Sequence, residues 1–178
     1  MSPFSRSGYY NPMVPSPSKT VSNLVEKLAN TLLSKKLIMS TAESCTGGWI
    51  SQCLTAISGS SQWFDTGFVT YSNEAKQRLL SVPPEIFEID GPGAVSEETV
   101  LAMTRGAIAN SRANVAVAVS GIAGPDGGSD DKPVGTVWIA WQWEDKSLAQ
   151  CFQFSGDREA VRLATVEAAL HGTLLLVN

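Results

Sequence analysis

The sequence predicts an α/β fold with a mixed, mostly parallel sheet and helices on the faces of that sheet. Three observations support this prediction. Helical and strand-like patterns alternate along the chain from Thr20 onward. The run VAVAV at Val115–Val119 is typical of a strand that is covered on both faces. Two apolar segments that flank EDKS predict a terminal antiparallel hairpin, which makes the sheet mixed rather than all parallel.

The first third of the predicted domain contains a helix, a strand and a second helix. Apolar residues recur at helical spacing from Val21 to Leu32, with Thr20 as a candidate N-terminal cap. The short apolar run Leu37–Thr41 predicts a strand. The segment Thr46–Ile57 predicts a helix that begins in a glycine-rich turn.

The rest of the chain continues the alternation. Phe68–Tyr71 predicts a strand, and Asn73 is the candidate cap of a helix that ends at Leu80. Ser96 starts another helix, and the two glutamates that follow it suit the positive end of the helix dipole. The last predicted elements are the strands Val115–Val119, Val134–Trp141 and Leu148–Phe154 and a helix from the cap Asp157 to about Val177.

Length and composition bound the function. The chain has 178 residues, which suits one domain at 20–178 behind a proline-rich extension at 1–19 that we expect to be flexible. A net charge of −4 argues against a nucleic-acid partner. One histidine and three cysteines without CxxC spacing exclude the usual zinc sites, so we expect no metal and no other cofactor. No apolar run approaches a membrane span and no secretory signal is seen, so we expect a cytoplasmic protein without a membrane partner.

The segment TAESCTGG lies between a predicted strand and a predicted helix. Ser44 is there a candidate nucleophile, because unpaired N–H groups at a helix start, such as those of Cys45 or Thr46, stabilise an oxyanion. Gly47 and Gly48 allow a ligand to approach the backbone closely. The alternative is structural, with Ser44 serving as a helix cap in a tight turn.

The segment YSNEAK supplies a candidate base. If Asn73 is the cap, Lys76 lies in the first helical turn, where a cation opposes the helix dipole. One interpretation is a solvated lysine paired with Glu74. The other is an amine made neutral by the dipole and by burial, which activates Ser44 while Tyr71 relays a proton.

The segment SGIAGPDGG follows the most apolar strand. Ser120, Gly121 and Gly124 there are candidates for a backbone-lined wall against a nucleotide. The segment matches no known phosphate-binding motif, so a long surface turn is an equal alternative.

Two arginines open the last helix. Arg158 and Arg162 lie four residues apart, on one side of the first turns. Because a cation is disfavoured at a helix start, they predict an anion such as a substrate phosphate. Pairing with the neighbouring Asp157 or Glu159 is the alternative.

The other nucleophilic or titratable side chains are weaker candidates. Cys45 is a possible thiol nucleophile at a helix start, with Glu43 beside it. Cys53 and Cys151 lie in apolar patterns and are expected in the core. His171, far along the last helix, is expected to be a packing or surface residue.

Five segments carry a resemblance to a known family over about residues 20–177. They are TAESCTGGWIS, GSSQWFDTGFVTYSNEAK, GAVSEETV, SGIAGPDGGSDDKPVGTVW and FSGDREAVR. The chain resembles the deamidase domain of the CinA family. That resemblance implies a three-layer α/β/α sandwich and a homodimer or higher homo-oligomer. It also implies hydrolysis of the carboxamide of nicotinamide mononucleotide, a small-molecule nucleotide substrate, to nicotinate mononucleotide and ammonia.

The resemblance also suggests roles for particular residues. By position, Ser44 resembles the family nucleophile, and Tyr71 and Lys76 resemble its partners. The glycine-rich loops and Arg158 resemble substrate-binding elements. Two further hypotheses stay open: a non-catalytic relative that binds a pyridine nucleotide, and an amidase of another small amide that uses Cys45. The metal-dependent pyrophosphatase domain of larger family members is not expected here.

Overall fold

The computed structural model describes residues 19–178. The predicted extension at 1–19 therefore lies outside the described residues apart from Lys19, and the predicted domain boundary stays a prediction. The strands are β1 (Met39–Glu43), β2 (Phe64–Val69), β3 (Val115–Gly121), β4 (Thr136–Trp143) and β5 (Lys146–Gln153). The helices are α1 (Lys19–Lys35), α2 (Trp49–Thr55), α3 (Asn73–Leu80), α4 (Glu97–Ala109) and α5 (Arg158–Val177), with short 3₁₀ turns at Ser60–Gln62 and Pro84–Phe87.

The five strands form one mixed sheet in the order β2-β1-β3-β4-β5. Strand β1 pairs in parallel with β2 and β3, whereas β4 pairs antiparallel with β3 and β5. Four strands therefore run in one direction and only β4 runs against them. The predicted fold class is confirmed, and β4 and β5 form the predicted terminal hairpin.

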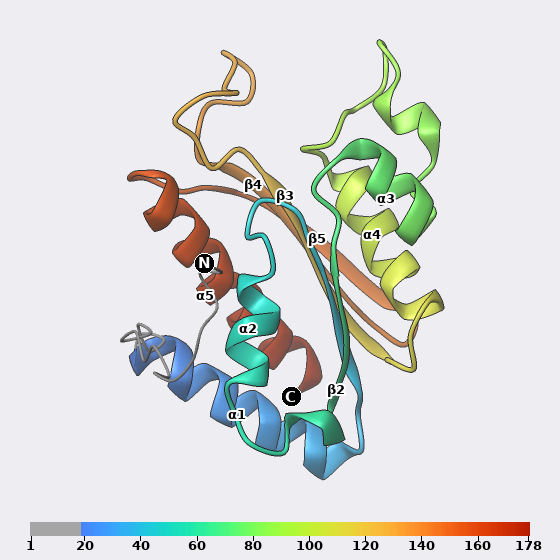
Figure 1. Ribbon diagram of the computed structural model, residues 1–178, viewed down its shortest axis with the longest axis vertical. Coiled ribbons are helices and arrows are strands. Elements are labelled where there is room, and N and C mark those ends of the chain that lie inside the picture. The colour runs from blue at the N-terminus through green and yellow to red at the C-terminus, as the bar shows by residue number, and fades with distance from the viewer. Residues whose placement is uncertain (1–18) are drawn as a thin grey trace, which may run out of the picture.

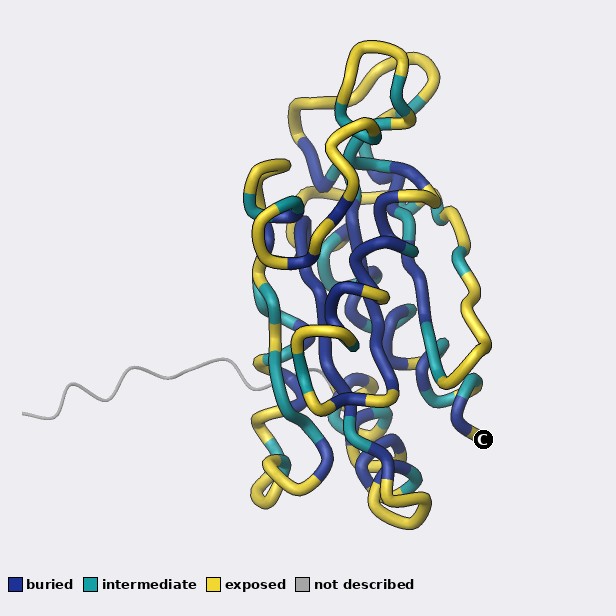
Figure 2. The backbone as a smooth tube through the Cα atoms, turned by 90° about the vertical axis from the view of Figure 1, so that its right-hand side faces the viewer, coloured by how far each residue is buried: buried dark blue, intermediate teal, exposed yellow. Residues whose placement is uncertain are grey.

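Helices cover both faces of the sheet and produce two apolar layers (Figure 1). Helices α1, α2 and α5 pack on one face, and α3 and α4 pack on the other. Covered on both faces, β1 is buried at every residue and β3 at every residue except the last (Figure 2). The carboxyl ends of β1, β2 and β3 meet at one edge of the sheet, which is where ligands bind in open α/β folds.

Several predicted boundaries are wrong. The second strand is Phe64–Val69 rather than Phe68–Tyr71, so Tyr71 lies in the loop beyond it. The polar Asp65 and Thr66 hid this strand, because an edge strand pairs through its backbone and tolerates exposed side chains. Thr20 lies within α1 rather than capping it.

The helix caps follow the predictions in two of three further cases. The side chains of Ser96 and Asp157 accept hydrogen bonds at the starts of α4 and α5, as predicted. At α3 the cap is Ser72 and not Asn73, since the Ser72 hydroxyl accepts from the N–H of Ala75. Lys76 is therefore the fourth residue of α3 rather than the third, and it lies just past the first turn.

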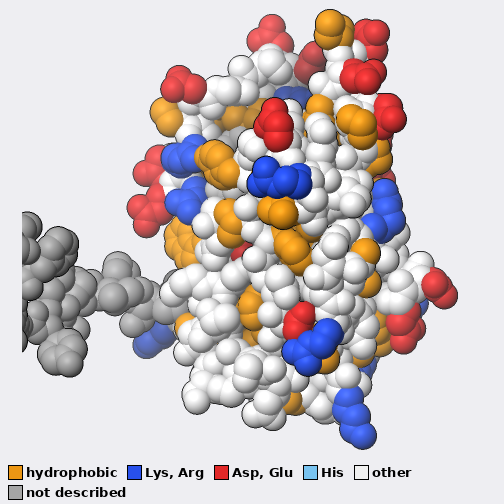
Figure 3. Space-filling view, turned by 45° about the vertical axis from the view of Figure 1, so that its right-hand side comes forward, with side chains coloured by type: hydrophobic (Ala, Val, Ile, Leu, Met, Phe, Trp, Pro, Cys, Tyr) orange, Lys and Arg blue, Asp and Glu red, His pale blue; other side chains and the backbone are white. Residues whose placement is uncertain are grey.

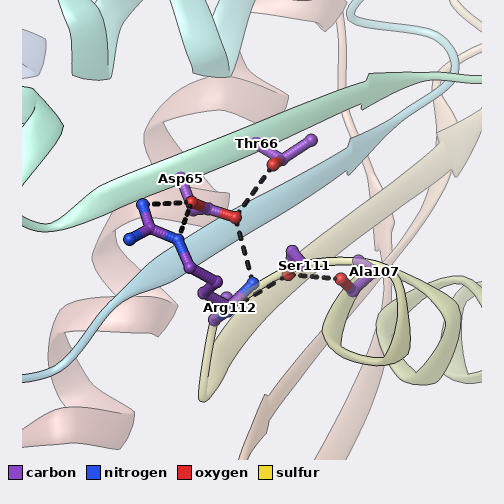
Figure 4. A network of polar contacts seen from close by, with 6 residues as sticks. Asp65, Thr66, Ala107, Ser111 and Arg112 are labelled. Atoms are coloured by element: carbon purple, nitrogen blue, oxygen red, sulfur yellow. Dashed lines mark hydrogen bonds and ion pairs between the residues drawn. The ribbon is translucent and has the colours of Figure 1, made fainter.

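An ion pair stabilises the opposite end of the sheet (Figure 4). Asp65, at the start of β2, lies 2.6 Å from the guanidinium of Arg112, which follows α4. The backbone N–H of Arg112 also donates to this carboxylate, and these bonds lower the pKa of Asp65. The edge strand is thus tied to the turn between α4 and β3, far from the site described below.

The charges on the surface and the hydropathy of the helices bear on two expectations, that the protein has no nucleic-acid partner and no membrane partner. On the face shown in Figure 3, acidic and basic side chains are interspersed rather than gathered into one basic patch. Within residues 19–178, one helix, α5, is long and apolar enough to cross a membrane by length and composition, which corrects the expectation that no such run exists. Its buried residues pack on the sheet and α1, as in core helices of globular proteins. The cytoplasmic location and the homo-oligomer stay predictions.

Candidate active site

Three polar residues lie at the carboxyl ends of the three neighbouring parallel strands, two directly after their strand and one within it. Ser44 comes directly after β1, and its N–H donates to the carbonyl of Val119 at 3.1 Å. Thr70 comes directly after β2, and its N–H donates to the carbonyl of Glu43 at 2.9 Å. Ser120 is the sixth residue of β3. The parallel register therefore places segments from distant parts of the sequence side by side.

Lys76 reaches this edge from α3. Its Nζ lies 2.9 Å from the Oγ of Ser44 and donates at 2.9 Å to the carbonyl of Thr70. Lys76 is 1 % exposed and Ser44 is 8 % exposed. Burial lowers the pKa of the Lys76 ammonium from 10.5 to about 8, because desolvation disfavours the charged form. The solvated lysine paired with Glu74 is thus not what the fold contains.

We call residues 44–48 the nucleophile turn. Gly47 and Gly48 have φ angles of 61° and 96°, a left-handed conformation that favours glycine. Gly48, not Ser44, is the cap residue of α2, so the alternative of Ser44 as a helix cap is wrong. The N–H of Gly47 donates to the carbonyl of Ser44 at 3.0 Å, which closes the turn.

Glu43 holds the nucleophile turn through hydrogen bonds. The sequence predicts a role for Glu43 only as the neighbour of a Cys45 nucleophile. Its buried carboxylate accepts from the hydroxyl of Thr46 at 2.6 Å and from the N–H of Gly48 at 3.1 Å. It also accepts from the N–H groups of Ile50 and Ser51 in the first turn of α2. A glutamate at the end of a buried strand was the available signal, because a buried charge requires partners.

A cavity of about 230 Å³ opens beside the Ser44–Lys76 contact. Five predicted site residues besides that pair line it: Cys45, Tyr71, Ser120, Gly121 and Arg158. It is also lined by Asn73, Ala94, Val95 and Ala123, none of which the sequence patterns predict as site residues. Ala94 and Val95 belong to the segment GAVSEETV, and the Ser120 hydroxyl donates to the Ala94 carbonyl at 2.6 Å.

The predicted binding residues of the glycine-rich segments are only partly brought to this cavity. Four of them do not line the cavity: Thr46, Gly47, Gly48 and Gly124. Thr46 and Gly48 bind Glu43 instead, and the Gly124 carbonyl accepts from Arg158 at 2.7 Å. Their contact with a substrate stays a prediction.

Arg158 connects the far wall of the cavity to Tyr71. Its Nη2 donates to the phenolic oxygen of Tyr71 at 2.8 Å. Tyr71 is 63 % exposed and stands at the rim. Within residues 19–178, Arg158 forms no ion pair with Asp157 or Glu159, and its guanidinium contacts the Gly124 carbonyl and the Tyr71 phenol instead. Two of the five guanidinium N–H groups are used, and three stay available to an anion.

The three cysteines differ in their surroundings. Burial raises the pKa of the Cys45 thiol from 9.0 to about 12, so this thiol stays protonated near neutral pH. Cys53 is buried as predicted, but Cys151 is exposed on the outermost strand, which corrects its assignment to the core. His171 is exposed on α5. Within residues 19–178, no cluster of three His, Cys, Asp or Glu side chains is arranged to hold a metal.

Among the other hollows of the described residues, one adjoins the cavity and another is larger. A groove of about 410 Å³, lined by Trp49, Arg158, Glu159 and Arg162, shares Arg158 with the cavity. A larger hollow of about 770 Å³ follows the loop 85–92, whose lining holds acidic and apolar side chains but no nucleophile with a base. Of these three hollows, only the cavity beside Ser44 combines a hydroxyl group with a buried amine.

Comparison with known proteins identifies the family of this chain. Nicotinamide-nucleotide amidohydrolase PncC of Pseudomonas putida is 53% identical over 156 residues, covering 88% of this chain and 96% of that protein. The protein of the same name from Escherichia coli K12 is 49% identical over 150 residues, covering 83% and 88%. The crystal structure of competence/damage inducible protein CihA from Agrobacterium tumefaciens superposes with a TM-score of 0.87 at 43% identity, covering 93% of this chain and 99% of that one. Residues 21–176 match the family described as CinA C-terminal domain, and the chain therefore belongs to the CinA C-terminal domain family.

Proposed function

We propose that this protein hydrolyses the carboxamide of nicotinamide mononucleotide to nicotinate mononucleotide and ammonia, with Ser44 as nucleophile and Lys76 as general base. The observation that carries the mechanism is the 2.9 Å contact between the buried Nζ of Lys76 and the Oγ of Ser44. The substrate is supported by relatives named nicotinamide-nucleotide amidohydrolase, which match most of the chain at 49–53% identity.

The environment of Lys76 suits a base. With a pKa of about 8, roughly a tenth of the lysine is uncharged at pH 7. The neutral amine has two N–H groups and one lone pair. One N–H can stay on the Thr70 carbonyl while the lone pair accepts the proton of the Ser44 hydroxyl, without any change in the position of Nζ.

The reaction then follows an acyl-enzyme course. The Ser44 Oγ bonds to the carboxamide carbon as its proton passes to Lys76, and the carbonyl electron pair moves onto oxygen. The N–H groups of Cys45 and Thr46 stabilise this oxyanion. The proton on Lys76 passes to the amide nitrogen, the C–N bond breaks, and ammonia leaves. Lys76 then takes a proton from water, and the hydroxide adds to the nicotinoyl ester of Ser44. The ester C–O bond breaks, the Ser44 Oγ takes the proton back from Lys76, and the acid product releases its proton to solvent as the carboxylate.

The rim of the cavity suits the remainder of the nucleotide. A cavity of about 230 Å³ is smaller than the roughly 300 Å³ at which ligand pockets usually begin, so it suits the nicotinamide ring alone. Arg158 stands where the cavity meets the groove, with three N–H groups for the 5′-phosphate. The Tyr71 phenol accepts from Arg158 and keeps its own O–H as a donor, so Tyr71 is the alternative to Lys76 as the group that gives the proton to the leaving amine.

The use of Cys45 as nucleophile is less well supported. Its thiol is 5 % exposed, its pKa is raised by burial, and Glu43 is committed to the nucleophile turn. We expect Cys45→Ala to retain ammonia release within about threefold, while an amidase that used the thiol would lose it by several decades. Inactivation by iodoacetamide is expected to be slow.

The test of the proposed function is ammonia release from nicotinamide mononucleotide, nicotinamide riboside and NAD by the purified full chain. We expect the mononucleotide to be preferred, and Ser44→Ala to lose activity by about 10³-fold or more. Ser34→Ala, an exposed serine of α1, is the matched control. A wild-type protein that binds the mononucleotide but releases no ammonia would instead be a binding relative.

A further inference from the structure

We infer that Arg162 is a positioning residue that orients the peptide groups of the nucleophile turn, so that the N–H groups of Cys45 and Thr46 meet the oxyanion. This inference rests on the proposed function and concerns the same site. Arg162 does not line the catalytic cavity but the neighbouring groove. It therefore acts on the reaction through the turn.

Arg162 holds two consecutive carbonyl groups of the turn. Its Nε donates to the carbonyl of Cys45 at 3.1 Å, and its Nη2 donates to that of Thr46 at 2.7 Å. The guanidinium lies 5.2 Å from the ring centre of Trp49, the first residue of α2, which limits its movement from the other side. The planar fork of arginine makes this double contact, which the single ammonium of lysine cannot reproduce.

The hydrogen bonds of the turn leave two donors unused. The carbonyls of Ser44, Cys45 and Thr46 all accept, from Gly47 in the first case and from Arg162 in the other two. The N–H groups of Ser44, Gly47 and Gly48 all donate, to Val119, Ser44 and Glu43 respectively. Within residues 19–178, the N–H groups of Cys45 and Thr46 donate to no other residue. The N–H of Cys45 lies near its own Sγ and, among the described residues, near no other acceptor. Two successive N–H groups with no acceptor on another described residue, beside the proposed nucleophile, form an anion-binding concavity.

The geometry of the peptide bond connects Arg162 to these donors, directly for Thr46 and through Gly47 for Cys45. The Thr46–Gly47 peptide, held at its carbonyl by Arg162, places the N–H of Gly47 on the Ser44 carbonyl, and this bond fixes the peptide that carries the Cys45 N–H. The Cys45–Thr46 peptide is trans, so its carbonyl and its N–H point in opposite directions. Fixing the Cys45 carbonyl on the Arg162 side therefore turns the N–H of Thr46 to the opposite side. A cation on the carbonyl also polarises the peptide and strengthens its N–H as a donor. Both effects stabilise charge that appears only in the transition state, so they raise kcat without tightening substrate binding.

A phosphate-binding role is the competing interpretation of Arg162, and steady-state kinetics separates the two. We would measure kcat and KM for ammonia release from nicotinamide mononucleotide with Arg162→Met and Arg162→Lys. Arg105→Met, an exposed arginine on α4, is the matched control. Thermal melting checks the fold of each variant, and Arg162→Lys serves as the test if Arg162→Met does not fold.

We expect Arg162→Met to lower kcat by about 10- to 100-fold with KM unchanged within threefold, since loss of one oxyanion donor costs about 10²–10³-fold. We expect Arg162→Lys to fall between Arg162→Met and wild type, and Arg105→Met to equal wild type. A raised KM with unchanged kcat would assign Arg162 to the phosphate and overturn the inference, as would unchanged values of both. In either case an active wild type leaves the proposed function standing, whereas an inactive wild type removes both.

Discussion

Two buried charged residues contact the segment around Ser44, Glu43 from the face of the sheet covered by α2 and Lys76 from the face covered by α3. The two differ in how many hydrogen-bond partners their charged groups have. Glu43 accepts six hydrogen bonds from the α2 side, from three hydroxyl groups and three backbone N–H groups. Lys76 has two partners on the α3 side, the Thr70 carbonyl and Ser44, the proposed nucleophile. The comparison indicates that the saturated charge holds the turn in place, while the poorly satisfied one is available for proton transfer.

The largest expected effect comes from removing the base. Lys76→Met should lower kcat/KM for ammonia release by about 10³–10⁴-fold, because the Ser44 hydroxyl then has no base to take its proton. The measurement is a continuous assay of ammonia release from nicotinamide mononucleotide. Lys27→Met, at an exposed lysine of α1, should leave the rate unchanged. Retention of a tenth or more of the activity in Lys76→Met would contradict the assignment.

On the other side of Ser44 the expected effect is on folding. Glu43→Gln should lower the free energy of unfolding by about 3 kcal/mol, because the new amide group would face N–H and hydroxyl donors instead of accepting from them. Urea denaturation followed by tryptophan fluorescence measures this change. Glu26→Gln, an exposed glutamate on α1, is the control and should change stability by less than about 0.5 kcal/mol. Equal stability of the two variants would show that the six contacts do not anchor the turn.

The pH dependence of the rate probes the availability of Lys76. Only the uncharged amine accepts a proton, so kcat/KM should rise about tenfold per pH unit below a pKa of about 8 and level off above it. A profile measured from pH 5.5 to 9.5 checks this slope. A rate that falls as the pH rises through 8 would require a protonated Lys76 and exclude it as the base.

The smallest expected effect is a gain in thermal stability for Lys76→Met, whereas Glu43→Gln is expected to lose stability. The pKa of Lys76 is lower in the folded chain than its ordinary value of 10.5, so the unfolded chain binds more protons between about pH 8 and 10.5. Stability of the wild type should therefore rise across that interval. Lys76→Met lacks this rise and should melt about 2–4 °C above the wild type at pH 6, an advantage that shrinks by pH 10. Calorimetry at both pH values measures it, and a constant difference would mean that the ammonium is not penalised by burial.

Local patterns in the chain predicted much of the fold. The alternating helices and strands, the buried run of β3, the terminal hairpin and the caps Ser96 and Asp157 all agree with the structure. These features depend on side-chain periodicity and on hydrogen bonds between near neighbours, which a sequence displays directly. The strand Phe64–Val69 was misplaced because its pairing uses backbone groups that carry no residue signature.

The sequence also predicts Ser44, Tyr71 and Lys76 as site residues. Ser44 and Tyr71 stand out at predicted strand ends, and Lys76 stands out as a cation near the start of a helix. Sequence patterns do not predict the distances between these side chains. Ser44 and Lys76 are 32 residues apart in the chain and meet only because β1 and β2 pair in parallel. The roles of Glu43 and Arg162 likewise depend on contacts between separate elements, and Arg162 reaches the nucleophile turn from more than 100 residues away. Burial is a property of the packed chain, so the lowered pKa of Lys76 and the raised pKa of Cys45 follow from the three-layer arrangement rather than from any segment of sequence.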